Sequence, residues 1–236
     1  MKFEKYAKQT HFYSQKIPLL LKKYLSEKNT KSYMDLGCGD GALLFEMLNS
    51  NFLKNKKIYA VDLSEKRLEK IKKLKSDITC IQNDACNLKD IQNSEIDFIT
   101  SSQVIEHVSD DEKMIKEMHR ILKENGTIYL STVFKKKFAW YFYRCNGKWT
   151  LDPTHVREYT NETQLFSIIN NNNFQIIETK KSFIWFTPIH FILRLFKTKN
   201  DIHKHTVIRL LQKIKIPIPR YRNWELILKK SKGKSA

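Results

Sequence analysis

The sequence lacks the features that mark membrane-spanning, secreted and disulfide-stabilised proteins. It contains no run of about 18 apolar residues, so we expect no segment that spans a bilayer. Its first residues, Met1 to Lys5, lack the apolar core of a signal peptide. The four cysteines show neither paired metal-ligand spacing nor a disulfide framework; they are Cys38, Cys80, Cys86 and Cys145. These absences predict a protein of the reducing cytoplasm.

Acidic residues are few relative to basic ones. The chain has 43 Lys and Arg against 25 Asp and Glu, a formal net charge of +18. This excess fits binding to nucleic acid, to an anionic membrane surface or to an acidic substrate. It fits equally well a lysine-rich surface that is simply solvated, so charge alone selects none of these. With 236 residues and 41% hydrophobic content, the chain can form one domain with a good core, and disorder of the whole chain is excluded.

Only six glycines occur, and three of them, Gly37, Gly39 and Gly41, share one short stretch. An apolar run precedes them and a helical pattern follows, which predicts a strand, a tight turn and a helix. Glycines allow positive φ and close approach of a ligand, and the amides that open the helix favour a negatively charged group. Gly37, Gly39 and Ala42 also satisfy the dinucleotide fingerprint, which leaves NAD as an alternative. Asp35 favours a different ligand, because a carboxylate suits ammonium and sulfonium groups better than a pyrophosphate.

The motif Asp35-x-Gly37-x-Gly39-x-Gly41 resembles the first motif of the class I S-adenosylmethionine (SAM)-dependent methyltransferases. The resemblance implies a Rossmann-like α/β fold with SAM as the cofactor and S-adenosylhomocysteine as its product. It also implies that Asp35, Gly37 and Gly39 contact the cofactor.

Two further pairs of residues are assigned to the cofactor. Asp62 follows the glycine turn by roughly 20–25 residues, where a doubly wound fold places a ribose-binding acid, and Leu63 is adjacent. A carboxylate there accepts from both ribose hydroxyls, whether SAM or NAD is bound. The family resemblance implies that Asp84 accepts from the adenine amino group and that the Ala85 amide contacts the ring. The alternative for Asp84 is a plain turn former.

The motif Gln103-x-x-Glu106-His107 resembles the Glu-x-x-Glu-His segment of quinone-biosynthesis O-methyltransferases. In that subgroup the acids and the histidine line the methyl-transfer pocket and can hold a divalent cation. Gln103 replaces the first acid, so we expect no metal here, and we assign Gln103 to the cofactor pocket. A later segment containing His155 resembles the His-x-Arg-x-Tyr/Phe connection of the same subgroup. A neutral hydroxyl acceptor must lose its proton, so His107 and His155 are candidate bases, and we favour His107.

Strand and helix patterns alternate over residues 32–133, which predicts a parallel sheet with helices on both faces. We expect a seven-stranded, mostly parallel, Rossmann-like sheet in a single domain over residues 1–236. Residues 221–229 are predicted as the last strand, turned back antiparallel to the others.

The remaining segments are predicted to surround this sheet. Residues 1–30 are expected to form a helical lid that includes His11-Phe12-Tyr13, and Leu19, Leu20, Leu21, Tyr24 and Leu25 are expected to pack inward. Residues 134–160 and 183–219 are expected to be insertions that form a cap. The second insertion is apolar, aromatic and basic, which fits either a cap over the site or a contact with a membrane interface.

The sequence therefore predicts a SAM-dependent methyltransferase, with O-methylation of a small, lipid-linked or sugar-like hydroxyl compound as the preferred reaction. The expected partner is a small-molecule or lipid-linked acceptor; peripheral contact with an anionic membrane is a further possibility, and RNA is the second choice. A tRNA methyltransferase, an NAD-dependent oxidoreductase and a non-catalytic scaffold of the same fold are the alternatives. The residues do not distinguish O-methylation from N- or C-methylation.

Overall fold

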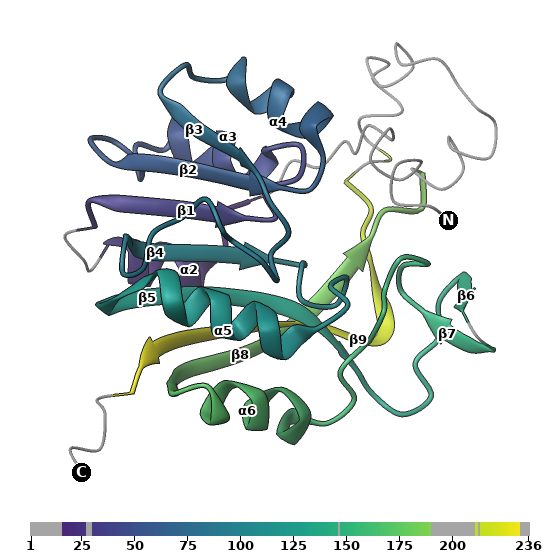
Figure 1. Cartoon of the computed structure of the whole chain (residues 1–236). Helices are drawn as coiled ribbons and strands as arrows, with labels where there is room; N and C mark the ends of the chain where they lie inside the picture. Colours follow the sequence, from purple (N-terminus) through teal and green to yellow (C-terminus); the bar gives the residue numbers. More distant parts are fainter. Residues whose placement is uncertain (1–15, 27–29, 146, 190–210, 212, 232–236) are drawn as a thin grey trace.

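The computed structural model describes residues 16–26, 30–145, 147–189, 211 and 213–231 (Figure 1). A seven-stranded sheet runs through its centre. Its strands in chain order are β1 (Ser32–Leu36), β2 (Lys57–Asp62), β3 (Ile78–Gln82), β4 (Ile96–Ser102), β5 (Leu122–Lys135), β8 (Phe174–Phe186) and β9 (Ile216–Lys230). Their order across the sheet is β3-β2-β1-β4-β5-β9-β8. The first five strands are parallel to one another, and β9 is antiparallel to both β5 and β8. The predicted fold, including the antiparallel last strand, is confirmed.

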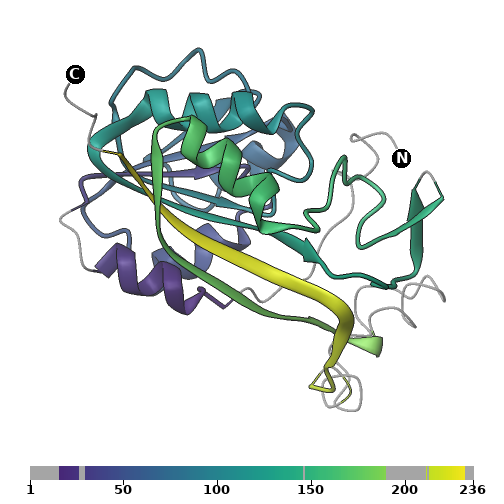
Figure 2. The ribbon, with the colours of Figure 1, turned by 90° about the horizontal axis from the view of Figure 1, so that it is seen from below.

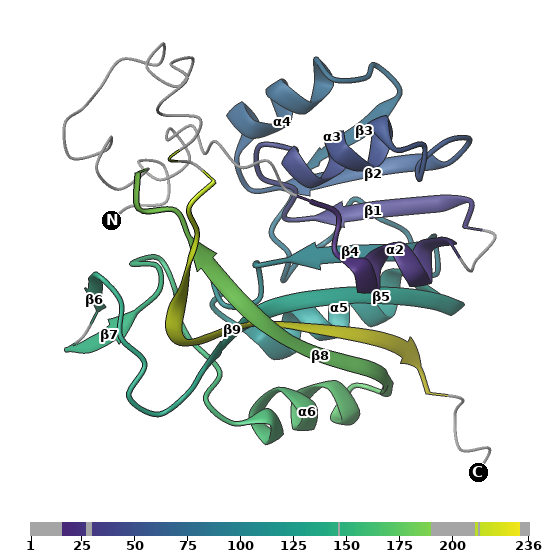
Figure 3. The same cartoon turned by 180° about the vertical axis from the view of Figure 1, so that it is seen from behind.

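Helices cover both faces of the sheet (Figures 1 and 2). They are α2 (Leu19–Ser26), α3 (Ala42–Asn49), α4 (Glu65–Lys72), α5 (Asp111–Ile121) and α6 (Glu162–Asn171). One core cluster joins α5 and α6 to the sheet, and a second joins α2, α3 and α4 to the opposite face (Figure 3). Side chains on the two faces of β1 pack into different clusters: Met34 lies in the first cluster and Tyr33 in the second. No helix in the described ranges is long and apolar enough to cross a bilayer.

Part of the predicted N-terminal helical segment lies within the described residues. Of the described residues before β1, Leu19–Ser26 form the helix α2, and residues 1–15 and 27–29 lie outside the described ranges. The Pro18 carbonyl accepts from the Lys22 amide at 3.0 Å, so the proline stands just before the helix, where its fixed φ is tolerated. Leu19 was expected to pack inward but is 72% exposed. The segment His11-Phe12-Tyr13 lies outside the described residues.

The C-terminal strands are longer than predicted, which corrects the bounds of the second insertion. β8 continues to Phe186 and β9 begins at Ile216, so both ends of the predicted insertion 183–219 belong to one β-hairpin. Residues 190–210 and 212, most of the insertion's interior, lie outside the described residues. The first insertion, 134–160, contains a small hairpin of β6 (Tyr143–Cys145) and β7 (Lys148–Thr150) that the sequence did not predict.

Candidate functional site

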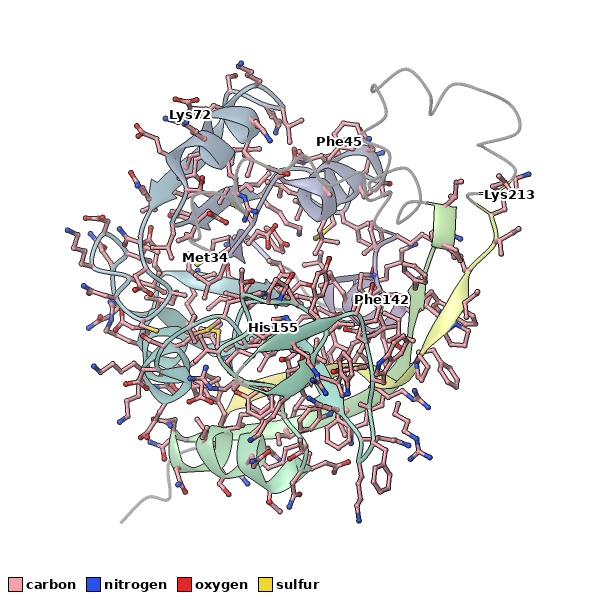
Figure 4. All side chains as sticks on the ribbon, turned by 90° about the vertical axis from the view of Figure 1, so that its right-hand side faces the viewer. Met34, Phe45, Lys72, Phe142, His155 and Lys213 are labelled. Carbon is pink, nitrogen blue, oxygen red and sulfur yellow. The ribbon has the colours of Figure 1, made fainter. Side chains whose placement is uncertain are left out.

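The predicted site residues gather where the parallel strands end. Figure 4 looks onto this edge, with Met34 of β1 and His155 labelled. The glycine turn leaves β1 and is held against β2, because the amides of Gly37 and Cys38 both donate to the Val61 carbonyl, at 2.8 and 3.0 Å. Gly37 has φ +75, and a Cβ there would lie 2.3 Å from Cγ2 of Val104. The turn therefore contacts the loop after β4 directly, and only glycine fits at this position.

Asp35 lies on β1 next to this turn, and its side chain is almost wholly buried. None of the described residues donates a hydrogen bond to its carboxylate. Burial, together with the nearby charge of Asp62, raises the pKa of Asp35 to about 7. A buried acid without a compensating donor is costly unless a cationic group comes to it. Asp35 therefore fits a ligand that carries a positive charge.

Asp62 ends β2 and holds the glycine turn in place. Its Oδ2 accepts from the Gly39 amide at 2.9 Å, and its Oδ1 accepts from the Ser64 amide at 2.8 Å. Each oxygen has a second lone pair for a ligand hydroxyl. Arg67 of α4 lies beside Asp62, with Nη1 3.9 Å from Oδ2, and is nearly buried. No pattern in the sequence pointed to Arg67, because a basic residue on a helix ordinarily lies on its solvated face.

Other residues assigned to the cofactor, Leu63, Asp84 and Ala85, lie at the ends of β2 and β3. Leu63 is 50% exposed, and its carbonyl accepts from Nε2 of Gln82 at 3.2 Å. Asp84 is exposed, and its Oδ1 accepts from the Cys86 amide at 2.8 Å, the contact of a turn former. Ala85 is buried in the core cluster on the α5 side of the sheet. The turn contact leaves Asp84 Oδ2 for a ligand, so both interpretations of this residue still stand.

Gln103 has a backbone and side-chain arrangement that the sequence did not predict. Its φ is +58, and its amide donates to the Ser131 carbonyl at 2.9 Å. Its Nε2 donates to Oδ1 of Asn223 on β9, at 3.0 Å. The side-chain amide therefore links the end of β4 to β9, and its assignment to the cofactor stays a prediction.

The two predicted histidines are in contact near the carboxyl end of β4, although His107 and His155 are far apart in the sequence. The rings of His107 and His155 meet edge to face with centroids 4.7 Å apart. Thr154 Oγ1 donates to Asp152 and accepts from His107 Nδ1, 3.0 Å away, so the proton of neutral His107 is on Nδ1. Burial, with the charge of His155 adding to it, lowers the pKa of His107 to about 4. His107 is thus a weak base.

His155 has a different partner. Its Nδ1 lies 3.0 Å from Oε1 of Glu158, a carboxylate that can only accept, so Nε2 is the unprotonated nitrogen of the neutral ring. Burial by itself raises the pKa of Glu158. Hydrogen bonds from His155, the Leu151 amide, Lys135 and Thr150 outweigh that effect and lower it to about 2. The sequence prediction missed Glu158, whose only signal was an acid three residues after the histidine.

Glu106 is the third member of this cluster and is fully buried. Its Oε2 accepts from Thr132 Oγ1 at 2.9 Å, whereas its Oε1 has no hydrogen-bond partner among the described residues. Burial raises the pKa of Glu106 to about 7. Ligand atoms of Glu106, His107 and His155 all lie within 4.8 Å of one another, close enough to surround a divalent cation. The prediction of no metal rests on Gln103 and is not tested by this arrangement.

Residues 34–130 match the protein family described as a methyltransferase domain. This stretch contains the glycine turn, Asp35, Asp62 and the Glu106-His107 pair. This stretch, less than half of the chain, is similar to methyltransferase domains. The match ends at β5, before the segment that carries His155 and Glu158.

Comparison with known proteins gives relatives of two kinds. A ubiquinone biosynthesis O-methyltransferase of Pelagibacter ubique is 29% identical over 160 residues, which cover 63% of this chain and 63% of the relative. A tRNA N(3)-methylcytidine methyltransferase of Schizosaccharomyces pombe is 29% identical over 133 residues, 52% of this chain and 43% of the relative. The chain therefore matches less than two thirds of the length of either relative.

A solved structure of similar fold is the 1,6-didemethyltoxoflavin-N1-methyltransferase of Burkholderia thailandensis, with bound 1,6-didemethyltoxoflavin and S-adenosylhomocysteine. It has a TM-score of 0.57 and 14% identity, and the alignment covers 90% of this chain and 75% of the other. At this identity the likeness concerns the fold alone.

Proposed function

We propose that this protein transfers a methyl group from SAM to a hydroxyl oxygen of a small acceptor. The observation that carries the proposal is Asp35, a buried carboxylate beside the glycine turn that receives no hydrogen bond from the described residues. Its chemistry fits the ammonium end of SAM and does not fit a pyrophosphate. This preference separates SAM from NAD, which the glycines alone do not.

The residues at the edge of the sheet suit each part of SAM. Asp35 suits the charged aminoacyl end, and the turn at Gly37 and Gly39 permits close approach of a ligand. Asp62 keeps lone pairs for the ribose hydroxyls. Asp84 and Ala85 are assigned to the adenine by resemblance. When bound, SAM supplies an electrophilic methyl group on a positively charged sulfur.

His155 is the proposed general base, in place of the expected His107. His155 Nε2 accepts the proton of the acceptor hydroxyl as the oxygen is methylated, and the carboxylate of Glu158 stabilises the imidazolium that forms. The pKa of His107, lowered to about 4, makes that residue a poor competitor for the same proton. His107 instead packs against His155 and limits the positions its ring can take.

An oxygen acceptor is supported by the similarity to the ubiquinone biosynthesis O-methyltransferase of Pelagibacter ubique. Methylation of tRNA is the second candidate, supported by the Schizosaccharomyces pombe relative and by the net charge of +18. The two differ in salt dependence, because an RNA acceptor would bind through phosphates and lose affinity steeply as salt rises.

Calorimetry with SAM, S-adenosylhomocysteine and NAD, using wild type and Asp35→Asn, tests the cofactor. We expect SAM and its product to bind, NAD not to bind, and the variant to bind SAM more weakly. Incubation with radiolabelled SAM and a lysate separated into lipid, RNA and small molecules then identifies the acceptor class. Binding of NAD in preference to SAM would overturn the proposal, and label in the RNA fraction would favour the second candidate.

A further inference from the structure

Large apolar side chains are exposed at the far end of the β8–β9 hairpin and on the segment beside it. The exposed fraction reaches 76% for Phe138 and 56% for Trp185. We call the following residues the aromatic-basic tip: Lys137, Phe138, Trp140, Phe142, Phe183, Trp185, Ile214, Ile216, Arg220 and Arg222. In Figures 1 and 3 this part of the hairpin extends past the end of β4, on the same side as the candidate site.

The tip is held in place by packing on its inner side. Along β8 the side chains alternate, with Phe183 and Trp185 exposed and Ile184 and Phe186 directed at a small core cluster. That cluster contains Ile218 and Tyr221 of β9 together with Tyr141 and Leu151. Since successive strand residues point to opposite faces, Phe183 and Trp185 lie on the face of β8 opposite this cluster.

Hydrogen bonds join the two parts of the tip, which are the segment after β5 and the β8–β9 hairpin. The Lys136 amide donates to the Arg220 carbonyl at 3.0 Å, and Arg220 Nη1 donates to the Lys137 carbonyl at 3.2 Å. Phe142 reaches across to Phe186, with ring centroids 5.7 Å apart. Figure 4 shows Phe142 near the hairpin that leads to Lys213. The exposed rings therefore form one surface from two separate lengths of chain.

Cations lie against these rings, and the described stretches of chain that carry the rings contain no acidic residue. Arg222 lies 4.0 Å from the ring centroid of Phe183, and Lys137 lies 5.1 Å from that of Phe138. Within the described residues 136–150, 180–189, 211 and 213–222 there is no Asp or Glu. The same residues include the cations Lys136, Lys137, Arg144, Lys148, Lys180, Lys181, Lys213, Lys215, Arg220 and Arg222. The described part of this surface is thus apolar and carries an excess of positive charge.

We propose that the aromatic-basic tip docks on the surface of an anionic lipid bilayer. Tryptophan and phenylalanine at such a surface enter the boundary between headgroups and acyl chains, while neighbouring cations meet the lipid phosphates. Ile214 and Ile216, both at least half exposed, favour lipid over RNA. An aliphatic side chain gains free energy in hydrocarbon but offers no aromatic face on which a base can stack. The inference stands on these residues and does not depend on the identity of the methyl acceptor.

The test is binding of the full chain to vesicles of phosphatidylcholine with and without 30% phosphatidylserine, measured by flotation. We expect binding to the anionic vesicles only. Phe183→Ser with Trp185→Ser should lower the partition coefficient at least tenfold, and Lys137→Gln with Arg222→Gln should lower it and weaken its dependence on salt. Matched controls are Leu19→Ser with Phe45→Ser, which removes two exposed apolar side chains elsewhere, and Lys113→Gln with Lys116→Gln, which removes two charges on α5.

Each variant is first checked by circular dichroism and by thermal unfolding, so that a loss of binding is not a loss of fold. Three outcomes would overturn the proposal. The wild type could fail to bind anionic vesicles, or the tip variants could bind as well as their controls. The protein could instead bind tRNA or associate with itself through the tip, in which case the tip variants would lose tRNA affinity or self-association measured by light scattering, and the wild type would not bind vesicles. The calorimetric test of SAM binding is separate, so failure of either proposal leaves the other measurable.

Discussion

His155 Nδ1 lies 3.0 Å from Oε1 of Glu158, and the two residues are joined in a buried network with Lys135, Thr150 and the Leu151 amide. This network fixes which nitrogen of His155 carries the proton. It also places a full negative charge next to the ring at neutral pH, because the pKa of Glu158 is about 2. An imidazolium on His155 is therefore stabilised at the moment a proton reaches it.

Glu158→Gln should slow turnover by roughly 10- to 1000-fold while SAM affinity changes little. The amide cannot stabilise the imidazolium, and it can turn its NH2 toward Nδ1 and favour the wrong tautomer. Steady-state kinetics and calorimetry measure the two quantities separately. Glu162→Gln is the control, since this nearby acid pairs with Lys181 and does not contact His155. Equal turnover in the two variants would remove Glu158 from the mechanism.

Gly37→Ala should destabilise the protein by roughly 2–4 kcal/mol, because a Cβ would contact Val104 Cγ2 at 2.3 Å and the residue has φ +75. Gly147→Ala is the control, with the same φ of +75 but no atom within 4 Å of the added Cβ. It should cost only about 1–2 kcal/mol. Urea unfolding measures both. Val104→Ala should recover part of the loss in a double-mutant cycle, and a purely additive cycle would show that the contact is not the cause.

Asp35 predicts a pH dependence of cofactor binding. Its pKa in the free protein is about 7, and a cationic ligand needs it ionised, so binding releases a proton below that pH. The dissociation constant of SAM should rise about tenfold per pH unit as pH falls from 7 to 5. Asp35→Asn should remove this dependence and weaken binding at pH 8 by ~1.5–3 kcal/mol. A wild-type dissociation constant that stays constant over this range would contradict the assignment.

The same residue gives a prediction for stability, with the sign fixed by the direction of its shift. The pKa of Asp35 is raised from 3.8 to about 7 in the folded state. The stabilisation associated with its protonated form is fully present below pH 3.8 and is lost as pH rises through about 7. The free energy of unfolding of wild type should thus fall more steeply between pH 5 and 7.5 than that of Asp35→Asn. Glu106, whose pKa is also raised, titrates in both proteins and cancels in the comparison.

Removal of divalent metal should change turnover by no more than about twofold relative to the untreated protein, if His155 serves as the base and holds no metal. Dialysis against a chelator, followed by assay and elemental analysis, checks this. The geometry makes the test a demanding one, because Glu106, His107 and His155 offer three ligand atoms within 4.8 Å. If activity is lost with the metal and restored by adding it back, the protein uses a cation even though Gln103 stands where the resembling subgroup has a glutamate.

The sequence predicted the parts of the site that are local in the chain. Asp35, Gly37 and Gly39 lie within a few residues, and Asp62 ends the next strand, so strand pattern and turn chemistry were enough to group them. The contact between His155 and Glu158 was not predicted, because three residues' spacing in an irregular segment does not determine side-chain direction. Arg67 was missed because its burial depends on how α4 packs on the glycine turn.

The length of the last two strands was also beyond the sequence pattern. Phe183 to Phe186 is a short apolar run, and such a run fits a strand or a helix equally well. Only its pairing with residues 216–222 on β9 decides the matter, and that pairing joins segments far apart in the sequence. Leu19 was misplaced for a simpler reason: three consecutive leucines cannot all face one side of a helix.

The rings of His107 and His155 are in contact, but the two residues come from different parts of the chain. His107 lies inside the stretch that matches the methyltransferase family, and His155 lies after it. Under the proposed function, cofactor recognition and choice of acceptor would be encoded in separate stretches of the gene. Replacing residues 134–160 with the matching stretch of another such enzyme would be expected to redirect the substrate while leaving the methyl donor the same.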